Sequence, residues 1–268
     1  MDQQQAISHL KTACMLANQT DAALLAEWNS AKAKLGAAIP GAGHPDIKEI
    51  PNEHTDYLQK LQQVDWVANS SQPGMGLHGA TFKLIEIDPL LAYQFIVDTS
   101  RSGHHCDAFS KPPKMDELIP CCLPMVLPSG EYHYQVQPQS VIVTSRSLNL
   151  KMMGQGITTN MAGINFGWLL PVVHVVRLHG RCYLHNGFHR AYGARLAGAT
   201  HIPCVFRDVE SAQAANIIPG ATFDLPLLES DNPPTVAHFS QGRAHSVTLR
   251  ATTRILHVTW AEYAMYDE

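Results

Sequence analysis

The chain has 268 residues, 45% of them hydrophobic and 16% charged, and a formal net charge of −4. That is enough apolar content for a packed core in one large domain or two small ones. The net charge excludes the global basic field that drives binding to nucleic acids or membranes. No apolar run approaches the roughly 20 residues of a membrane span. Six scattered cysteines without a Cys-x-x-Cys pair indicate reduced thiols, and we expect a cytoplasmic protein.

The N-terminal region, residues 1–72, is expected to be helical. Apolar residues recur at helical spacing through 3–35, and a third helix is predicted from Pro51 onward. The run 70–76, Ser-Ser-Gln-Pro-Gly-Met-Gly, is the best candidate for a linker. An α+β domain then spans 73–268. The sequence leaves open whether the helices form a lid, a dimerisation arm or a partner-binding module.

Several further elements are predicted between residues 81 and 167. The expected elements are a strand over 81–87, a helix over 90–97, a buried irregular segment over 118–124, strands over 132–136 and 140–144, and a flexible loop over 154–167 or a helix over 159–166.

The stretch 99–107 contains two histidines, a cysteine and an aspartate, which are metal ligands by type. Adjacent side chains diverge in both helices and strands, so a single ion cannot easily take both imidazoles. We therefore predict no metal site here. A polar active-site loop containing Arg101 and His104 and an ordinary surface loop both stay open.

Residues 171–206 carry the most informative pattern. An apolar run over 171–176, a turn at His179-Gly180 and a second run over 182–185 predict two strands. Asn186-Gly187 is a turn dipeptide, because both residues tolerate a positive φ. From Phe188 the pattern becomes helical, Gly198 ends the helix, and a third strand is expected over 201–206.

The chemistry of this segment lies at its turn. A helix N-terminus presents backbone N–H groups and the positive end of the helix dipole, and His189 and Arg190 add side-chain donors. Gly187 has no Cβ, so a ligand can approach its backbone closely. Residues 171–210 also carry five arginines against one aspartate and one glutamate. The pattern indicates a site for a small anion, and phosphate is the best candidate.

The segment from about Leu170 to Val209, roughly forty residues, resembles the core of the ParB/sulfiredoxin-like superfamily. The resemblance rests on the strand-turn-strand pattern, on Asn186-Gly187-Phe188-His189-Arg190 opening a helix, and on the Ile202-Pro203 continuation. It implies a mixed sheet with this core at about 136–210. It also implies that the turn holds nucleotide phosphates, with Gly187, His189 and Arg190 as their ligands.

Two departures from the superfamily's patterns limit the chemistry. Sulfiredoxins place their catalytic cysteine where this chain has Phe188, so sulfinic-acid reduction is not expected. The motif is closer to the Asp-Gly-x-His-Arg form of free-serine kinases, but Asn186 replaces that aspartate. Arg146 matches, by order and character, an arginine that helps to hold the nucleotide.

The leading hypothesis is therefore an enzyme that binds ATP or CTP, with Mg²⁺, and transfers or hydrolyses a phosphoryl group. Phosphate would be bound by the five residues 186–190 and by Arg146, and His189 and Arg190 would be catalytic. No carboxylate lies near the motif, so Glu86, Asp107 and Glu131 are the candidate bases. A non-catalytic nucleotide-gated switch with a protein or DNA partner is the alternative, and a nuclease is the third.

The C-terminal part is expected to form a β-hairpin from 245–250 and 254–260 at a sheet edge. No recognition helix is readable after residue 210, so sequence-specific DNA binding is not expected. The fold class predicted from the whole chain is α+β, with a mixed sheet, a helical N-terminal region and this hairpin.

One prediction concerns redox chemistry. With Phe188 in the position of the sulfiredoxin cysteine, the purified protein should not reduce a sulfinylated peroxiredoxin in the presence of ATP. Mass spectrometry of the peroxiredoxin, with a true sulfiredoxin as positive control, measures this. Any ATP-dependent loss of the sulfinic acid would contradict the prediction.

Overall fold

The computed structural model divides the chain into two compact units, which are described separately. The first comprises residues 1–125 and 171–249, and the second residues 126–170 and 250–268. The structure describes residues 4, 7–8, 11, 19–34, 36–64, 80–92, 94, 96–99, 109–126, 132–145, 150–157, 162–168, 172–215, 217, 222–244, 246 and 254–261. The boundary expected near residue 72 lies outside these ranges and stays a prediction, and residues 136–170 of the expected core fall in the second unit.

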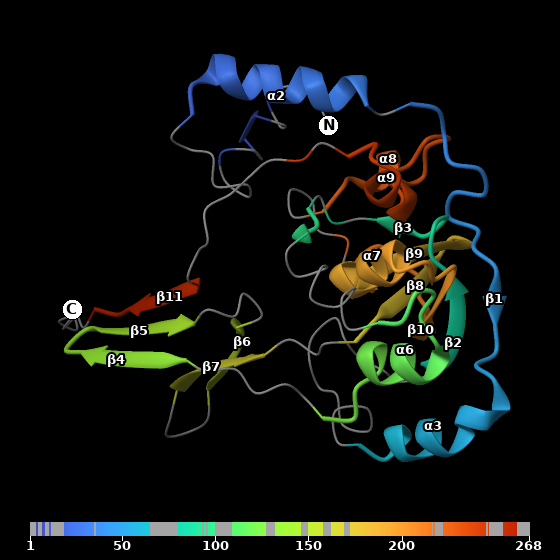
Figure 1. The fold of residues 1–268 in the computed structure, drawn as a ribbon. Coiled ribbons are helices and arrows are strands. Elements are labelled where there is room, and N and C mark those ends of the chain that lie inside the picture. The colour runs from blue at the N-terminus through green and yellow to red at the C-terminus, as the bar shows by residue number, and fades with distance from the viewer. Residues whose placement is uncertain are drawn as a thin grey trace. The chain divides into compact units, whose positions relative to one another are not determined.

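A six-stranded mixed sheet organises the first unit (Figure 1). Its order is β1-β2-β10-β8-β9-β3. Two of its pairs, β10 with β8 and β3 with β9, are parallel, and the other three are antiparallel. The strands are β1 Ile47–Lys48, β2 Thr81–Glu86, β3 Leu91–Ala92, β8 His174–Leu178, β9 Arg181–Asn186 and β10 His201–Asp208. The predicted α+β class with a mixed sheet is confirmed.

Helices make up the rest of the regular structure described in the first unit. They are α2 Asp21–Ala33, the 3₁₀ turn η1 Asn52–His54, α3 Thr55–Gln62, α6 Met115–Cys122, α7 Phe188–Leu196, α8 Leu225–Leu228 and α9 Val236–Ser240. Helix α2 lies in the stretch 3–35 that was expected to be helical, and the helix predicted from Pro51 onward is confirmed. Thr20 caps α2 by accepting a hydrogen bond from the Ala23 N–H. None of the helices in the described part of the chain has the length and apolarity needed to cross a membrane.

Three predicted elements of the first unit are wrong. Residues 91–92 form strand β3 where a helix was expected over 90–97, because Leu91 and Ala92 are both fully buried in the sheet. Residues 118–122 belong to helix α6, although Pro120 lies inside it. Glu117 fixes the start of α6 through bonds to the Ser110 hydroxyl and the Lys114 N–H. The sequence also predicts a short helix over 210–217, but residues 210–215 form bends and a turn.

The second unit is made of strands. A three-stranded antiparallel sheet has the order β11-β5-β4, and β6 pairs with β7 as a separate hairpin. The bounds are β4 His133–Gln137, β5 Ser140–Ser145, β6 Leu150–Ile157, β7 Ala162–Trp168 and β11 Arg254–Thr259. The two strands predicted over 132–144 are confirmed, and β11 lies at a sheet edge as expected. Residues 245 and 247–250 of the predicted hairpin lie outside the described part.

The prediction of a loop over 154–167, or of a helix over 159–166, is wrong. Residues 154–157 belong to β6 and residues 162–167 to β7, while residues 158–161 lie outside the described part of the chain. The glycines concealed an alternation that is typical of strands, since Ile164, Phe166 and Trp168 alternate with Gly163, Asn165 and Gly167.

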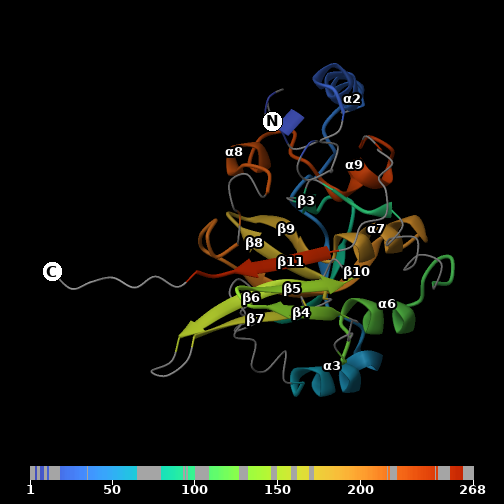
Figure 2. The same cartoon turned by 90° about the vertical axis from the view of Figure 1, so that its left-hand side faces the viewer.

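The two faces of the six-stranded sheet bury different sets of residues. On one face, Val176, Leu178 and Tyr183 pack with Leu91 and with Leu228 of α8. The other face carries α6 and α7 (Figure 2). There Cys122 of α6 lies close enough to Cys204 of β10 for the two thiols to affect each other's ionisation. The residue that connects the sheet to α7 is Gly187.

Gly187 has φ +91° and ψ +21°, which is the left-handed region that favours glycine. A Cβ at this position would lie 2.8 Å from the Val173 Cα and 3.2 Å from the Val172 carbonyl oxygen. The chain can therefore turn from β9 into α7 only with glycine here. The sequence indicated that the missing Cβ would leave room for a ligand. In the structure, Val172 and Val173, just before β8, fill that space instead.

We predict that Gly187→Ala costs about 2–5 kcal/mol of unfolding free energy, from left-handed strain and overpacking together. The matched control is Gly180→Ala, because Gly180 also has a positive φ (+79°) but no heavy atom within 4 Å of a Cβ. The control should lose only about 1–2 kcal/mol. Urea denaturation followed by circular dichroism measures both, and equal losses would contradict the packing argument.

Candidate functional site

The predicted strand–turn–helix is confirmed at the candidate site. Strand β9 ends at Asn186, and α7 begins at Phe188. The Asn186 Oδ1 accepts a hydrogen bond from the Gly187 N–H at 2.8 Å, and the Gly187 carbonyl accepts the first helical bond from the Ala191 N–H at 2.9 Å. Helix α7 runs for nine residues, so its first turn carries the positive end of a helix dipole.

Phe188 is buried, with 3% of its surface exposed. Its ring is therefore part of the core, and only its backbone could contact a ligand. A cysteine in this position would lie at the start of the helix, which is where the sulfiredoxin pattern places one.

His189 contacts a distant segment of the chain. Its Nε2 accepts a hydrogen bond from the Asp98 backbone N–H at 3.1 Å. An accepting Nε2 fixes the neutral tautomer with its proton on Nδ1, so the side chain offers one N–H donor. The contact also brings a carboxylate-bearing residue to a motif that has no carboxylate of its own.

Arg190 is the most unusual cation of the site. Its side chain is half-buried, and its Nε is closed off from solvent without a hydrogen-bond partner in the described part of the chain. Leaving a charged donor unsatisfied costs at least about 1–3 kcal/mol. Its charge lies near Cys122, where burial raises the pKa of the thiol and Arg190 acts in the opposite direction.

Two other arginines of this unit, unlike Arg190, are each paired with a carboxylate. Arg195, at the end of the same helix, donates to Asp88 through Nε at 2.7 Å and through Nη2 at 3.0 Å. Arg177 of β8 binds Asp208 in the same two-pronged way, at 2.6 and 3.1 Å. Both are neutralised by a carboxylate, whereas no carboxylate in the described part of the chain forms an ion pair with Arg190.

Among the other predicted site residues, Glu86 is the one that lies in the described part of the chain. Arg146, Arg101, His104, Asp107 and Glu131 all lie outside the described residues. Glu86 is in β2, which is separated from β9 by β10 and β8, or about 14 Å across the sheet. Its side chain accepts a hydrogen bond from the Asp46 N–H at 3.1 Å. Glu86 therefore supports the β1–β2 pair and is not placed as a base.

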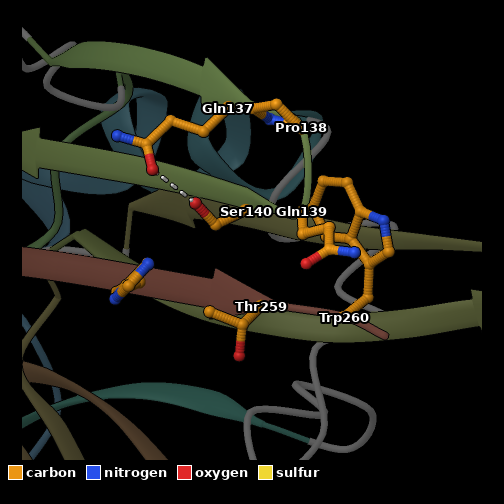
Figure 3. A pocket seen from close by; sticks show the side chains of 7 residues that line it. Gln137, Pro138, Gln139, Ser140, Thr259 and Trp260 are labelled. Atoms are coloured by element: carbon orange, nitrogen blue, oxygen red, sulfur yellow. Dashed lines mark hydrogen bonds between the residues drawn. The ribbon is translucent and has the colours of Figure 1, made fainter. Parts of the chain in front are cut away.

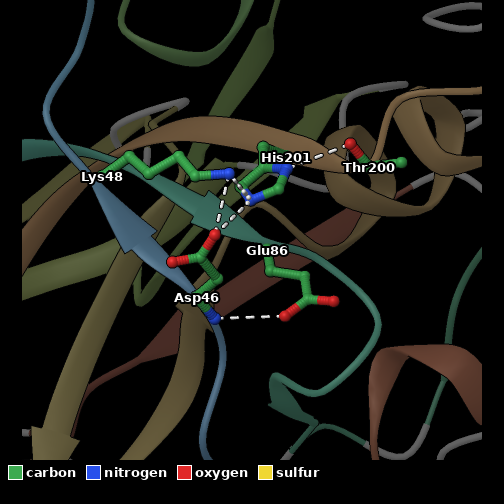
Figure 4. Close-up of polar contacts among 5 residues, drawn as sticks. All are labelled: Asp46, Lys48, Glu86, Thr200 and His201. Carbon is green, nitrogen blue, oxygen red and sulfur yellow. Dashed lines mark hydrogen bonds and ion pairs between the residues drawn. The ribbon is translucent and has the colours of Figure 1, made fainter.

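A polar network lies near Glu86, with side chains from Asp46 and β1, from Thr200 and from β10 (Figure 4). Lys48 contacts the Asp46 carboxylate at 2.7 Å and the His201 Nε2 at 3.2 Å, and the His201 Nδ1 contacts the Thr200 hydroxyl at 3.0 Å. The hydrogen bond from Lys48 is the main cause of the lowered pKa of Asp46. These contacts join β1 to β10 across β2.

Sequence reasoning missed a pair of buried histidines. The rings of His174 in β8 and His185 in β9 lie 4.7 Å apart, and His174 is fully buried. Neither ring nitrogen of His174 has a hydrogen-bond partner within the described ranges. Burial lowers the pKa of His174 to about 2 and that of His185 to about 4, and the charge of Arg207 acts in the same direction. Both imidazoles are therefore neutral at pH 7.

The second unit contains a surface hollow of about 400 Å³ (Figure 3). Its lining residues come from the β4–β5 turn and the end of β11: Gln137, Pro138, Gln139, Ser140, His257, Thr259 and Trp260. The Ser140 hydroxyl donates to the Gln137 side chain at 3.1 Å. No lysine or arginine is among these described lining residues, so they do not supply the charge that phosphate binding needs.

Comparisons with known proteins return nothing: no family model, no curated protein and no solved structure matches the chain. The ParB/sulfiredoxin-like resemblance therefore stays a prediction. Among the described residues, no group of three or more His, Cys, Asp or Glu side chains could hold a metal ion.

The buried histidines predict how stability depends on pH. Both folded pKa values lie below the unfolded value of about 6.5, so the unfolded state binds more protons in acid. Stability is therefore complete above about pH 6.5 and falls as the pH drops toward 4 and then 2. For each histidine the loss between pH 7 and pH 5 is about 2 kcal/mol.

His174→Phe should remove one of these losses. Urea denaturation at pH 7 and pH 5 measures the change within each variant, so a general destabilisation by the substitution cancels. His44→Asn provides the control, because it removes an exposed imidazole and leaves the buried pair in place. A His174→Phe protein with the same loss as wild type would show that His174 does not become protonated on unfolding.

Proposed function

We propose that the chain binds a nucleoside triphosphate, ATP or CTP, with its phosphates at the first turn of α7, and that it transfers or hydrolyses a phosphoryl group. The observation that carries the proposal is Arg190, which lies in that first turn with a buried Nε and no carboxylate among its described neighbours. A phosphate oxygen would supply the missing acceptor. The backbone amides of the turn and the helix dipole would add to the attraction.

Each residue of the motif has a distinct part in the proposed site. Gly187 sets the direction of the helix through its left-handed backbone. Arg190 would bind phosphate oxygens with its planar fork, and its charge would offset the charge that develops on the leaving group. His189 would donate from Nδ1. Asn186 would contribute only at the edge of the site, because its Oδ1 already accepts from Gly187.

The ion that the chemistry needs would be Mg²⁺. It would offset the charge that develops on the phosphates, and it commonly binds through substrate phosphates and water rather than through an all-protein cage. The superfamily core is part of the same proposal. Strands β8 and β9, helix α7 and strand β10 follow one another in the order which that resemblance predicts.

A non-catalytic, nucleotide-gated switch is the second candidate. The observation in its favour is the bond from the Asp98 N–H to His189. A phosphate that bound the protonated form of His189 would remove the acceptor at Nε2, break this bond and so change the position of residues 96–99. In that case the nucleotide would be bound but not consumed, and a partner would bind the changed conformation more or less tightly.

We predict that Arg190→Ala weakens binding of Mg·ATP or Mg·CTP by about 10–100-fold, which corresponds to the roughly 1.5–3 kcal/mol of a charge-assisted hydrogen bond. Titration calorimetry on folded proteins measures the dissociation constants. Arg195→Ala is the matched control, because it removes the same charge from the same helix at the end where Asp88 neutralises it. Unchanged affinity in Arg190→Ala, or equal losses in both variants, would refute the site.

A further inference from the structure

Strand β4, His133–Gln137, is an outer strand of the three-stranded sheet of the second unit (Figure 1). Strand β5 pairs with one of its edges, and no other strand in the described part of the chain pairs with the opposite edge. All five residues of β4 are exposed. An exposed edge of this kind presents a row of backbone N–H and C=O groups that can pair with a strand of another chain.

The edges of the six-stranded sheet are protected against such pairing, whereas β4 is not. Strands β1 and β3 are only two residues long, β1 contains Lys48, and both residues of β3 are fully buried. Short edge strands and lysines are common devices that prevent pairing between chains. The segment 132–137, Tyr-His-Tyr-Gln-Val-Gln, contains no Asp, Glu, Lys, Arg or Pro. The other edge of its own sheet, β11, begins at an arginine, Arg254.

One face of β4 is apolar up to the edge of the sheet. Tyr134 and Val136 share this face, and they are 68% and 65% exposed. Their partners in β5 are Val143 and Val141, so the apolar face spans both strands. Tyr132, just before β4, is 54% exposed, and its ring centroid lies 6.5 Å from that of Tyr134. Covering these side chains with another strand would remove apolar surface from water, which is favourable.

We propose that β4 pairs in antiparallel fashion with β4 of a second copy of this chain, about a two-fold axis at Gln135. The result is a continuous sheet with the order β11-β5-β4-β4-β5-β11. A second copy suits the edge because the strand is complementary to itself in this register. Tyr134 lies opposite Val136 of the second copy, and aromatic and β-branched residues stabilise each other across strands. His133 lies opposite Gln137, and no like charges meet. Because the contact is the same on both copies, it closes as a dimer.

The dimer is independent of the proposed function, and its interface is small. Sedimentation velocity of the full-length chain, from about 1 µM to 300 µM, should therefore show a reversible monomer–dimer equilibrium with a dissociation constant in the micromolar range.

Gln135 provides the decisive variants, because in this register it lies opposite itself. Gln135→Lys and Gln135→Glu each place two like charges across the axis, so each should raise the dissociation constant about fivefold or more. An equimolar mixture of the two variants places opposite charges there and should restore the dimer. Since Gln135 is exposed, both variants should fold, and recovery in the mixture verifies it. Gln62→Lys is the control, because it adds the same charge at an exposed position of α3 and should leave the dissociation constant unchanged.

The outcomes decide both the occupant and the register. Weaker dimers in each variant alone, with recovery in the mixture, would support the pairing about Gln135. A wild-type protein that stays monomeric at the highest concentration would overturn the proposal and leave this edge to another kind of partner. Dimers that persist in both variants, or that the mixture does not restore, would also overturn it. So would growth beyond the dimer, because a two-fold contact closes on itself.

Discussion

The arrangement of the site depends on one close contact between two backbones. Gly187 adopts a left-handed conformation and lies so close to Val173 that a Cβ on residue 187 would clash with it. This contact fixes where β9 stops and the direction in which α7 leaves the sheet. The positions of His189 and Arg190 follow from it, because both lie in the first turn of that helix. A rigid turn of this kind suits a binding site, since the donors are held in place before a ligand arrives.

The charges around the turn are distributed unevenly. Arg177 and Arg195 each engage a carboxylate through two hydrogen bonds, whereas Arg190 keeps a buried Nε without an acceptor within the described ranges. On the opposite face of the sheet, burial keeps His174 neutral. A folded protein retains such unsatisfied groups at a cost of stability, and sites of this type are commonly functional. A nucleotide phosphate at Arg190 would compensate part of that cost.

The sequence predicted the elements whose signals are local. The Asn186-Gly187 turn, the helix from Phe188 and the strand at His201 all follow from turn chemistry, spacing and caps, and the structure has each of them. The failures have non-local causes. Strand β3 is two residues long and exists because Leu91 pairs with Tyr183, and β7 was concealed by its glycines. Helix α6 contains Pro120, which a reading of propensity alone treats as a break.

The candidate site was predicted only in part, for the same reason. Arg190 was identified from the motif, but its lack of a partner depends on where Asp88 and Asp208 bind. Asp98 was missed because nothing in its neighbourhood marks it, and only the folded chain brings it to His189. The pairing of His174 with His185 likewise needs the register of β8 against β9, although two histidines in otherwise apolar strands were visible as a signal.

The central claim is that nucleotide phosphates bind at the first turn of α7. The most direct measurement is a titration of ¹⁵N-labelled protein with Mg·ATP and with Mg·CTP, following the backbone amides by NMR. The account predicts a saturable shift that is largest at Phe188, His189 and Arg190 and at the Asp98 amide that bonds to His189. Saturable binding that leaves these four amides unmoved, or no binding of either nucleotide, would contradict it.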